Sequence, residues 1–287
     1  MEFSYQRTVA ESLLEYGRGI TGGLIFSLPL LYTMEVWWTG FLLDPWRMLL
    51  YVIATFALLL LYNRFAGLRR DASFWEVAID SVEEMGIGLV LAAGMLWLTG
   101  QIDFQSGSTY EVTGKIVMEA MTVAIGVSVG TSQLGVSDED DEGMSGPDGR
   151  DDGQYLPQVA IALCGAVLFA ANIAATDEVT IIARDSPPGR ILVLAVISML
   201  GAAWTLAYSQ MQGADRHVRK GTKLEHFRGV VTTYAVALVG SAGCLFFFGR
   251  FDGQPVAFGF AMCVVAGVPA ALGASAGRLL LQTRSPS

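Results

Sequence analysis

The chain contains the same apolar unit twice, and this internal duplication restricts the folds that are open to it. Residues 22–55 align without a gap on a later segment when the numbering is moved by 143. The matched pairs include Gly22/Gly165, Phe26/Phe169, Thr33/Thr176, Glu35/Glu178, Pro45/Pro188 and Arg47/Arg190. Further matches follow in the same order at offsets of 149 and 147, among them Gly100/Gly249, Asp103/Asp252, Gly126/Gly273 and Gly130/Gly277. Ordered matches with drifting offsets are typical of a fused duplication with loop insertions, and transporters often use such a repeat.

The composition indicates that the unit lies in a membrane. Hydrophobic residues make up 53% of the 287 residues and charged residues only 16%, with a mean hydropathy of +0.48. A helix needs about 20 apolar residues to cross the hydrocarbon core of a bilayer. Eight segments approach that length: 19–43, 46–63, 74–99, 116–136, 156–183, 189–208, 226–248 and 254–281. We therefore predict an all-α, polytopic membrane protein with the lipid bilayer as its first partner.

Four helices in each unit predict that both units run in the same direction. The predicted fold is thus two parallel four-helix repeats, 1–136 and 155–287, about a pseudo-two-fold axis along the membrane normal. One face, which includes both termini, carries 13 of the 18 Lys and Arg residues. The positive-inside rule places this face, and both termini, in the cytoplasm, so the predicted location is the cell inner (plasma) membrane. No cleavable signal sequence is expected, because residues 1–18 lack an apolar core.

A polar segment, 137–154, separates the two repeats. It holds eight acidic residues against one arginine, with four glycines and a proline. This composition predicts a disordered acidic cytoplasmic linker. An EF-hand calcium loop is rejected, because Gly149 stands where the bidentate glutamate is required.

Glu35 and Glu178 are the first candidates for a functional site, because an acid inside a membrane helix is costly and usually faces a cavity or a partner. Two interpretations stay open. In the structural one, each glutamate forms a salt bridge with Arg47 or Arg190, which begin the next helix after Pro45 and Pro188. In the functional one, the two glutamates face each other across the pseudo-axis as an ion or proton site. The neighbouring oxygens in that site would come from Thr33, Thr176 and Asp177.

Two further groups are shared less evenly between the repeats. Asp80, Glu83 and Glu84 lie on one face of the third predicted helix, either as a solvated helix extension or as an acidic inner vestibule that concentrates cations. The segments Gly126–Gly130 and Gly273–Gly277 match the GxSxG of serine hydrolases. No histidine or strand-to-helix turn accompanies them, so we reject that function. They fit GxxxG packing better, between the fourth and eighth predicted helices or between two protomers.

The segment Phe26–Trp38 and its echo 169–179 resemble a family of uncharacterised prokaryotic polytopic integral membrane proteins with an internally duplicated four-helix unit. The resemblance implies a membrane fold and carries no activity.

Three classes of function remain open from the sequence. An ion channel or transporter for cations or protons is favoured, because paired acids on duplicated helices suit a pathway. The alternatives are a membrane sensor or scaffold acting through its cytoplasmic loops, and anion conduction through the outer arginines. A membrane-embedded enzyme is disfavoured by the missing catalytic constellations. We expect no cofactor and no nucleic acid, leave a metal open, and predict inorganic ions or protons and a homo-oligomer as further partners.

Overall fold

The computed structural model describes residues 9–67, 73–105, 107–133, 152–212 and 223–282, and all regular elements in these ranges are helices. In chain order they are α1 (Val9–Leu31), α2 (Met34–Leu42), α3 (Pro45–Ala66), α4 (Phe74–Leu98), α5 (Thr109–Gln133), α6 (Asp152–Ala174), α7 (Asp177–Asp185), α8 (Pro188–Gln212), α9 (Lys223–Phe247) and α10 (Val256–Gln282). The all-α prediction is confirmed.

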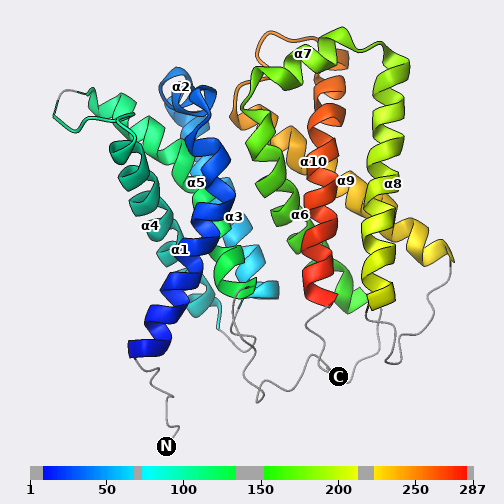
Figure 1. Cartoon of the computed structure of the whole chain (residues 1–287), viewed down its shortest axis with the longest axis horizontal. Helices are drawn as coiled ribbons and strands as arrows, with labels where there is room; N and C mark the ends of the chain where they lie inside the picture. Colours follow the sequence, from blue (N-terminus) through cyan, green and yellow to red (C-terminus); the bar gives the residue numbers. More distant parts are fainter. Residues whose placement is uncertain (1–8, 68–72, 106, 134–151, 213–222, 283–287) are drawn as a thin grey trace, which may run out of the picture.

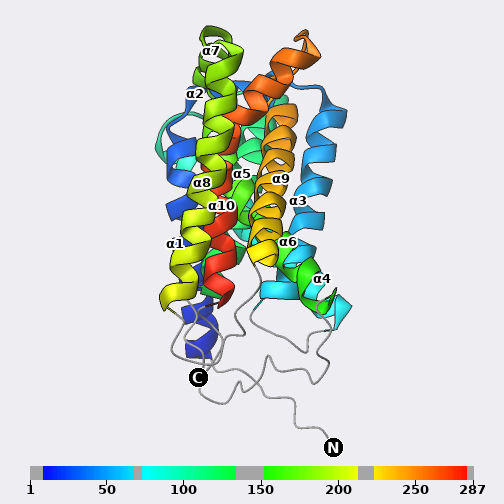
Figure 2. The same ribbon diagram turned by 90° about the vertical axis from the view of Figure 1, so that its right-hand side faces the viewer.

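The eight long helices stand side by side, and the short helices α2 and α7 lie together at one end of the molecule (Figure 1). We call this end of the molecule the α2/α7 end. The other end, where α1 begins, is called the opposite end. The helices α1–α5 form one group and α6–α10 the other, and α1 and α6 both run toward the α2/α7 end. Turning the molecule by 90° shows that the long helices remain roughly aligned in depth (Figure 2).

Seven of the described helices are long and apolar enough to cross a membrane: α3, α4, α5, α6, α8, α9 and α10. The first predicted span does not reach this standard, because α1 carries Glu15 and Arg18 in its first half. A polytopic membrane protein is therefore supported, with seven candidate spans among the described helices, and the eighth predicted span is not confirmed.

Two predicted spans, 19–43 and 156–183, are not continuous helices. The chain leaves the helical conformation at Thr33 and Thr176, which are extended N-caps of α2 and α7. Acidic residues occupy the first turn of both short helices. The helix dipole favours negative charge at that position. The prediction from hydropathy treated each short helix and the long helix before it as one continuous span.

Proline and glycine residues mark several helix starts and ends at matching positions in the two groups. Pro45 and Pro188 begin α3 and α8. A proline there lacks only an N–H that has no helical partner. Gly100 and Gly249 follow α4 and α9 with φ of 72° and 70°. Glycine adopts this left-handed conformation without strain. The next residue in each case donates its N–H to a carbonyl five residues back, which is a Schellman ending.

The helix bounds follow the duplication seen in the sequence. Adding 143 to the bounds of α1 and α2 gives those of α6 and α7, and adding 149 to those of α4 gives those of α9. The predicted linker, 137–154, is shorter than expected, because α6 already begins at Asp152. Residues 137–151 lie outside the described part of the chain.

Close glycine contacts hold each group together. Gly130 of α5 meets Gly22 of α1 backbone to backbone, with the Gly126 carbonyl also against Gly22. In the second group Gly273 of α10 meets Gly165 of α6 in the same way, and Gly277 meets Ile161. The glycines of α5 and α10 thus contact the first helix of their own group and not each other, as one expectation had it, while packing between two protomers stays a prediction. The two groups meet mainly where α6 packs against α3, with smaller contacts of α6 with α1 and α5 and of α3 with α9.

Candidate functional site

Glu35 and Glu178 lie on the short helices at the α2/α7 end and not inside a spanning helix. Glu35 is half-buried and Glu178 is exposed. The hydroxyl groups of Thr33 and Thr176 donate to carbonyls of the preceding helix, those of Pro29 (2.7 Å) and Ile173 (2.9 Å). The presence of these acids and threonines in both repeats therefore has a local explanation, because they lie at the starts of α2 and α7.

The predicted Glu35–Arg47 and Glu178–Arg190 salt bridges do not form among the described residues. Arg47 instead binds Asp252 of the second group, through two hydrogen bonds of 2.6 and 3.1 Å. Its guanidinium also lies over the rings of Trp46 and Phe246, at 5.5 and 5.2 Å from their centroids. The side chain of Arg47 is only 12% exposed, so this pair connects the two groups. Arg190, by contrast, is exposed.

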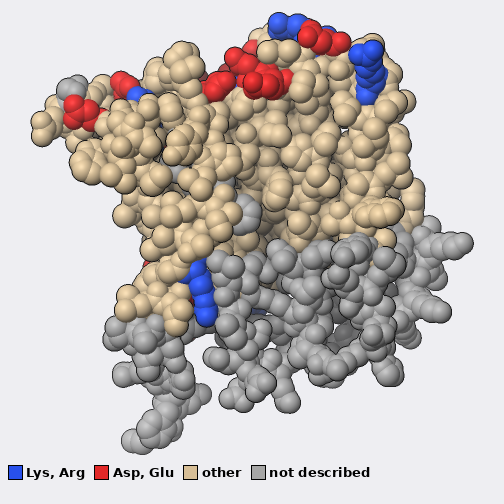
Figure 3. All heavy atoms as spheres, viewed as in Figure 1, with Lys and Arg blue, Asp and Glu red and all other residues tan. Residues whose placement is uncertain are grey.

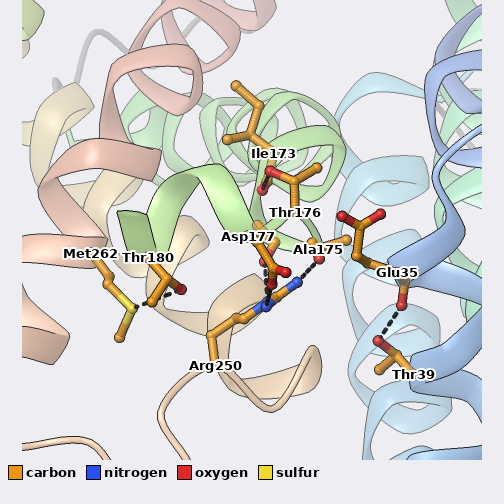
Figure 4. A network of polar contacts seen from close by, with 10 residues as sticks. Glu35, Thr39, Ile173, Ala175, Thr176, Asp177, Thr180, Arg250 and Met262 are labelled. Atoms are coloured by element: carbon orange, nitrogen blue, oxygen red, sulfur yellow. Dashed lines mark hydrogen bonds and ion pairs between the residues drawn. The ribbon is translucent and has the colours of Figure 1, made fainter. Parts of the chain in front are cut away.

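Arg250 closes the junction between α6 and α7 (Figure 4). Its guanidinium donates to the carbonyls of Ala174 and Ala175 at the end of α6 and pairs with Asp177 at 2.5 Å. A cation at this place neutralises the negative end of the α6 dipole. Asp177, predicted as an extra acid of an ion site, therefore has a structural partner, while Glu35 lies across from this junction on α2 (Figure 4).

Charged side chains gather at the α2/α7 end, above an uncharged middle band on the visible face (Figure 3). A surface pocket of about 310 Å³ lies there between α7 and the turn before α10. Its charged lining residues are Asp177, Arg184, Arg250 and Asp252, and three of these four take part in the salt bridges described above. The pocket is thus walled largely by paired charges.

The three acids of α4 do not act as one group. Glu83 is exposed and Asp80 half-buried, whereas Glu84 is buried with 8% of its surface exposed. The Glu84 carboxylate accepts a hydrogen bond of 2.7 Å from the Asn63 amide of α3. That amide also bonds Ser81 at 3.1 Å, and Ser128 of α5 donates to its oxygen at 2.8 Å. We call these four residues the Glu84 cluster.

A second acid, Glu119, lies in the middle of α5 and was missed in the sequence. It is fully buried, and neither of its carboxylate oxygens has a hydrogen-bond partner among the described residues. The indole N–H of Trp37, on α2, lies beside it, and this nitrogen also has no partner with good hydrogen-bond geometry. A buried carboxyl group without hydrogen bonds costs free energy, so Glu119 needs a functional explanation.

Two further polar contacts between α3 and α5 lie near Glu119 and beside the Glu84 cluster. Near Glu119, the hydroxyl groups of Tyr51 and Thr122 lie 3.0 Å apart. Toward the opposite end, those of Tyr62 and Ser132 lie 2.7 Å apart, beyond the Glu84 cluster. All of these side chains are buried. From Glu119 to Ser132 the series extends about 20 Å along α5, since a helix rises about 1.5 Å per residue. We call it the polar column.

The second group of helices has no equivalent column in its described part. At the matching offsets, Ala266 replaces Glu119, Thr233 replaces Glu84 and Leu194 replaces Tyr51. Four of its buried serine and threonine hydroxyl groups donate to carbonyls of their own helices, four residues back: Ser198, Thr233, Ser241 and Ser275. Among the described residues, both buried acids, Glu84 and Glu119, therefore belong to the first group.

A sequence signal for Glu119 existed, namely a single acid within the apolar segment 116–136, near its start. Its counterpart in the second repeat is alanine, so Glu119 is not among the acids that the two repeats share. No group of three or more His, Cys, Asp or Glu side chains that would suit a metal ion occurs within the described ranges.

Comparison with known proteins gives the family. No curated protein and no solved structure matches the chain. A family model described as "Putative integral membrane protein (DUF2391)" matches residues 15–281, which is nearly the whole chain. The match agrees with the apolar helices and with the family resemblance seen in the sequence. The chain therefore belongs to the DUF2391 family of integral membrane proteins.

Proposed function

We propose that the protein moves cations across the membrane through the first group of helices, and that the ion at Glu119 is a proton. The observation that carries this proposal is the fully buried Glu119 carboxyl group, which has no hydrogen-bond partner among the described residues. Acids inside membrane bundles are costly and mark ion pathways and proton relays. A purely structural acid would be expected to have hydrogen-bond partners.

The surroundings of Glu119 favour a proton over a metal ion. The polar side-chain group beside the Glu119 carboxyl group is the N–H of Trp37. This group is a donor and cannot coordinate a cation. The neighbouring residues on α5, Met118, Ala120 and Met121, are at most 1% exposed, so the helix is closely packed there. A proton neutralises the carboxylate without a shell of oxygen ligands.

The polar column supplies a route away from Glu119. Tyrosine, serine and threonine hydroxyl groups both donate and accept hydrogen bonds, so they are able to pass a proton along a chain. Thr55 on α3 is 3% exposed and lies between the Tyr51–Thr122 contact and Asn63 in the chain order of α3. We infer that the route runs between α3 and α5 toward the opposite end.

The two repeats have different roles, with the ion pathway in the first repeat alone. We infer two parallel repeats about a pseudo-two-fold axis along the membrane normal, of which the second acts as a scaffold. The matched helix bounds support the duplication, and the uncharged residues that replace both buried acids in the second repeat support the division. The inner-membrane location, the cytoplasmic termini and a homo-oligomer stay predictions, as does the absence of enzymatic activity. The anion alternative is weakened, because Arg47 is already bound to Asp252.

Proton flux into liposomes tests the proposal. The purified protein is reconstituted with a pH-sensitive dye inside the vesicles, and a potassium diffusion potential drives entry. We expect Glu119→Gln to reduce the initial rate by about 100-fold or more, since positioned proton carriers contribute factors of this size. Glu35→Gln and Glu178→Gln serve as controls and should keep the wild-type rate. Equal rates for Glu119→Gln and the wild type would refute the role of Glu119.

A further inference from the structure

Two buried polar groups lie side by side where α2 packs against α5, and neither has a hydrogen-bond partner among the described residues. They are the carboxyl group of Glu119 and the indole N–H of Trp37. An indole N–H only donates hydrogen bonds, and an ionised carboxylate only accepts them. The two groups therefore complement each other, although their geometry in this structure falls short of a hydrogen bond.

Packing holds the Trp37 ring beside Glu119. The ring lies partly buried against two apolar clusters, one containing Met118 of α5 and the other Leu96 of α4. Three residues further along α2, the backbone of Gly40 lies against the backbone of α5 at Gly114. The helix α2 is therefore held on α5, and the side chains of Trp37 and Glu119 are the parts that adjust to each other.

The second repeat lacks both members of this pair. Thr180 stands at the position of Trp37, and Ala266 stands at that of Glu119. The Thr180 hydroxyl group donates to the sulfur of Met262 on α10, at 3.7 Å. The indole and the acid thus occur together in one repeat and are replaced together in the other, as expected for two groups that act on each other.

The ionisable groups nearest to Glu119 on α5 and α3 already have partners. Lys115, one turn earlier on α5, donates to Glu111 at 2.6 Å and to a backbone carbonyl at 3.0 Å. Tyr51 of α3 acts on Glu119 electrostatically, and its hydroxyl group lies 3.0 Å from that of Thr122.

Other charged groups on the helices around α5 lie elsewhere. Glu35, two residues before Trp37 on α2, lies on a different side of that helix. Arg47 of α3 is bound to Asp252. The further charged residues described on α1, α3, α4 and α6 lie in the half of each helix toward the opposite end. Within the described ranges, the Trp37 N–H is therefore the donor that lies beside Glu119 without another partner.

We propose that Trp37 is a positioning residue for the proton carrier: its N–H binds the Glu119 carboxylate when the proton has left and releases it when a proton returns. A hydrogen bond to the charged form of an acid favours that form. Such a bond is also stronger than one to a neutral group. The indole keeps its own hydrogen throughout, so the proton that Glu119 releases leaves by another route. This inference rests on the proposed protonation of Glu119 and not on transport across the membrane.

The fluorescence of Trp37 tests the contact in the full-length protein in detergent. Emission is recorded as a function of pH for the wild type and three variants. An indole that gains and loses a hydrogen bond beside a charge changes its emission. We therefore expect a pH-dependent component in the wild type that both Trp37→Phe and Glu119→Gln remove. Trp38→Phe, which changes a 50% exposed neighbour on the same helix, should keep this component.

The pH profile of proton flux in liposomes gives a second readout. Without the donor the ionised carboxylate is less favoured, so Glu119 keeps its proton to higher pH. In Trp37→Phe the pH of half-maximal flux should therefore rise by about 1–2 units. Trp38→Phe should leave this pH unchanged. A loss of packing alone would lower the rate without moving the profile.

The outcomes separate this inference from the proposed function. A wild type without the pH-dependent emission component overturns the inference, and so does a component that persists in Trp37→Phe. Where Trp37→Phe fails to fold, Glu119→Gln decides, because a component that persists there overturns the contact. An emission change that depends on Glu119 in a protein without proton flux supports the contact and refutes the proposed function. Flux that depends on Glu119, with an unshifted profile in Trp37→Phe, leaves the proposed function standing and overturns the role of Trp37.

Discussion

At the scale of single residues, equivalent positions in the two repeats have different surroundings. Arg47 is 12% exposed and bound to Asp252, whereas its counterpart Arg190 is exposed. The sequence match between the two arginines predicted equal roles. The structure differs because α3 faces the second repeat, while α8 shows most of its apolar residues to the outside, with only 17% of its spanning segment buried.

The two arginines therefore provide a matched test of the contact between the repeats. Arg47→Met leaves Asp252 without its partner and removes two charged hydrogen bonds, so we expect the free energy of unfolding to fall by about 1–3 kcal/mol. Arg190→Met changes an exposed side chain and should shift it by less than about 0.5 kcal/mol. Thermal unfolding in detergent measures both. Equal losses would show that the Arg47–Asp252 pair does not stabilise the fold.

At the scale of helices, glycines have separate roles that the sequence alone does not distinguish. Gly22 of α1 lies against the backbone of Gly130, so an added Cβ would meet main-chain atoms that cannot move aside. Gly94 of α4 has no atom within 4 Å of the position that a Cβ would take. Both are helical glycines in apolar segments, and only their neighbours differ.

Alanine at these two positions should act in opposite directions. Gly22→Ala forces α1 and α5 apart, and we expect a loss of about 1–3 kcal/mol, as for other overpacked sites. Gly94→Ala removes backbone freedom from the unfolded chain without a clash, and should stabilise the protein by about 0.4–1 kcal/mol. Unfolding midpoints of the two variants, compared with the wild type, check this. A loss in Gly94→Ala similar to that in Gly22→Ala would mean that the close contact is not what matters.

At the scale of the whole molecule, the direction of insertion is the property that the proposed transport most depends on. The Lys and Arg residues are concentrated on one face of the predicted topology. This excess predicts that residues 137–154 face the cytoplasm and that α2 and α7 lie outside. The native cysteines give a low background for labelling, because Cys164 and Cys244 are buried and Cys263 is half-buried.

Cysteine labelling tests this orientation. Ser145→Cys in the linker should react with a membrane-impermeant thiol reagent only after the cells are opened. Asp185→Cys, at the exposed end of α7, should react in intact cells. The wild type serves as the control for the native cysteines. The reverse pattern would invert the membrane orientation, and the Glu84 cluster would then face the outside.

The sequence was sufficient for the properties that depend on local chemistry. Hydropathy predicted the membrane class and the approximate position of seven spans, because each apolar segment must satisfy its own backbone in lipid. Proline predicted the helix starts at Pro45 and Pro188, since its backbone restriction acts at a single residue. The duplication was also visible, and the matched helix bounds follow it.

The partners of the charged and polar side chains were decided only by the tertiary structure. Whether Arg47 reaches Glu35 or Asp252 depends on how α3 and α9 pack, and whether Glu119 faces Trp37 depends on the placement of α2. Contacts across helices are set by rotation about each helix axis and by helix crossing, which the packing of all the helices determines together. The periodicity of one segment does not identify the helices that pack against it. The sequence therefore indicated the acids shared by both repeats as site residues, and not the buried Glu119.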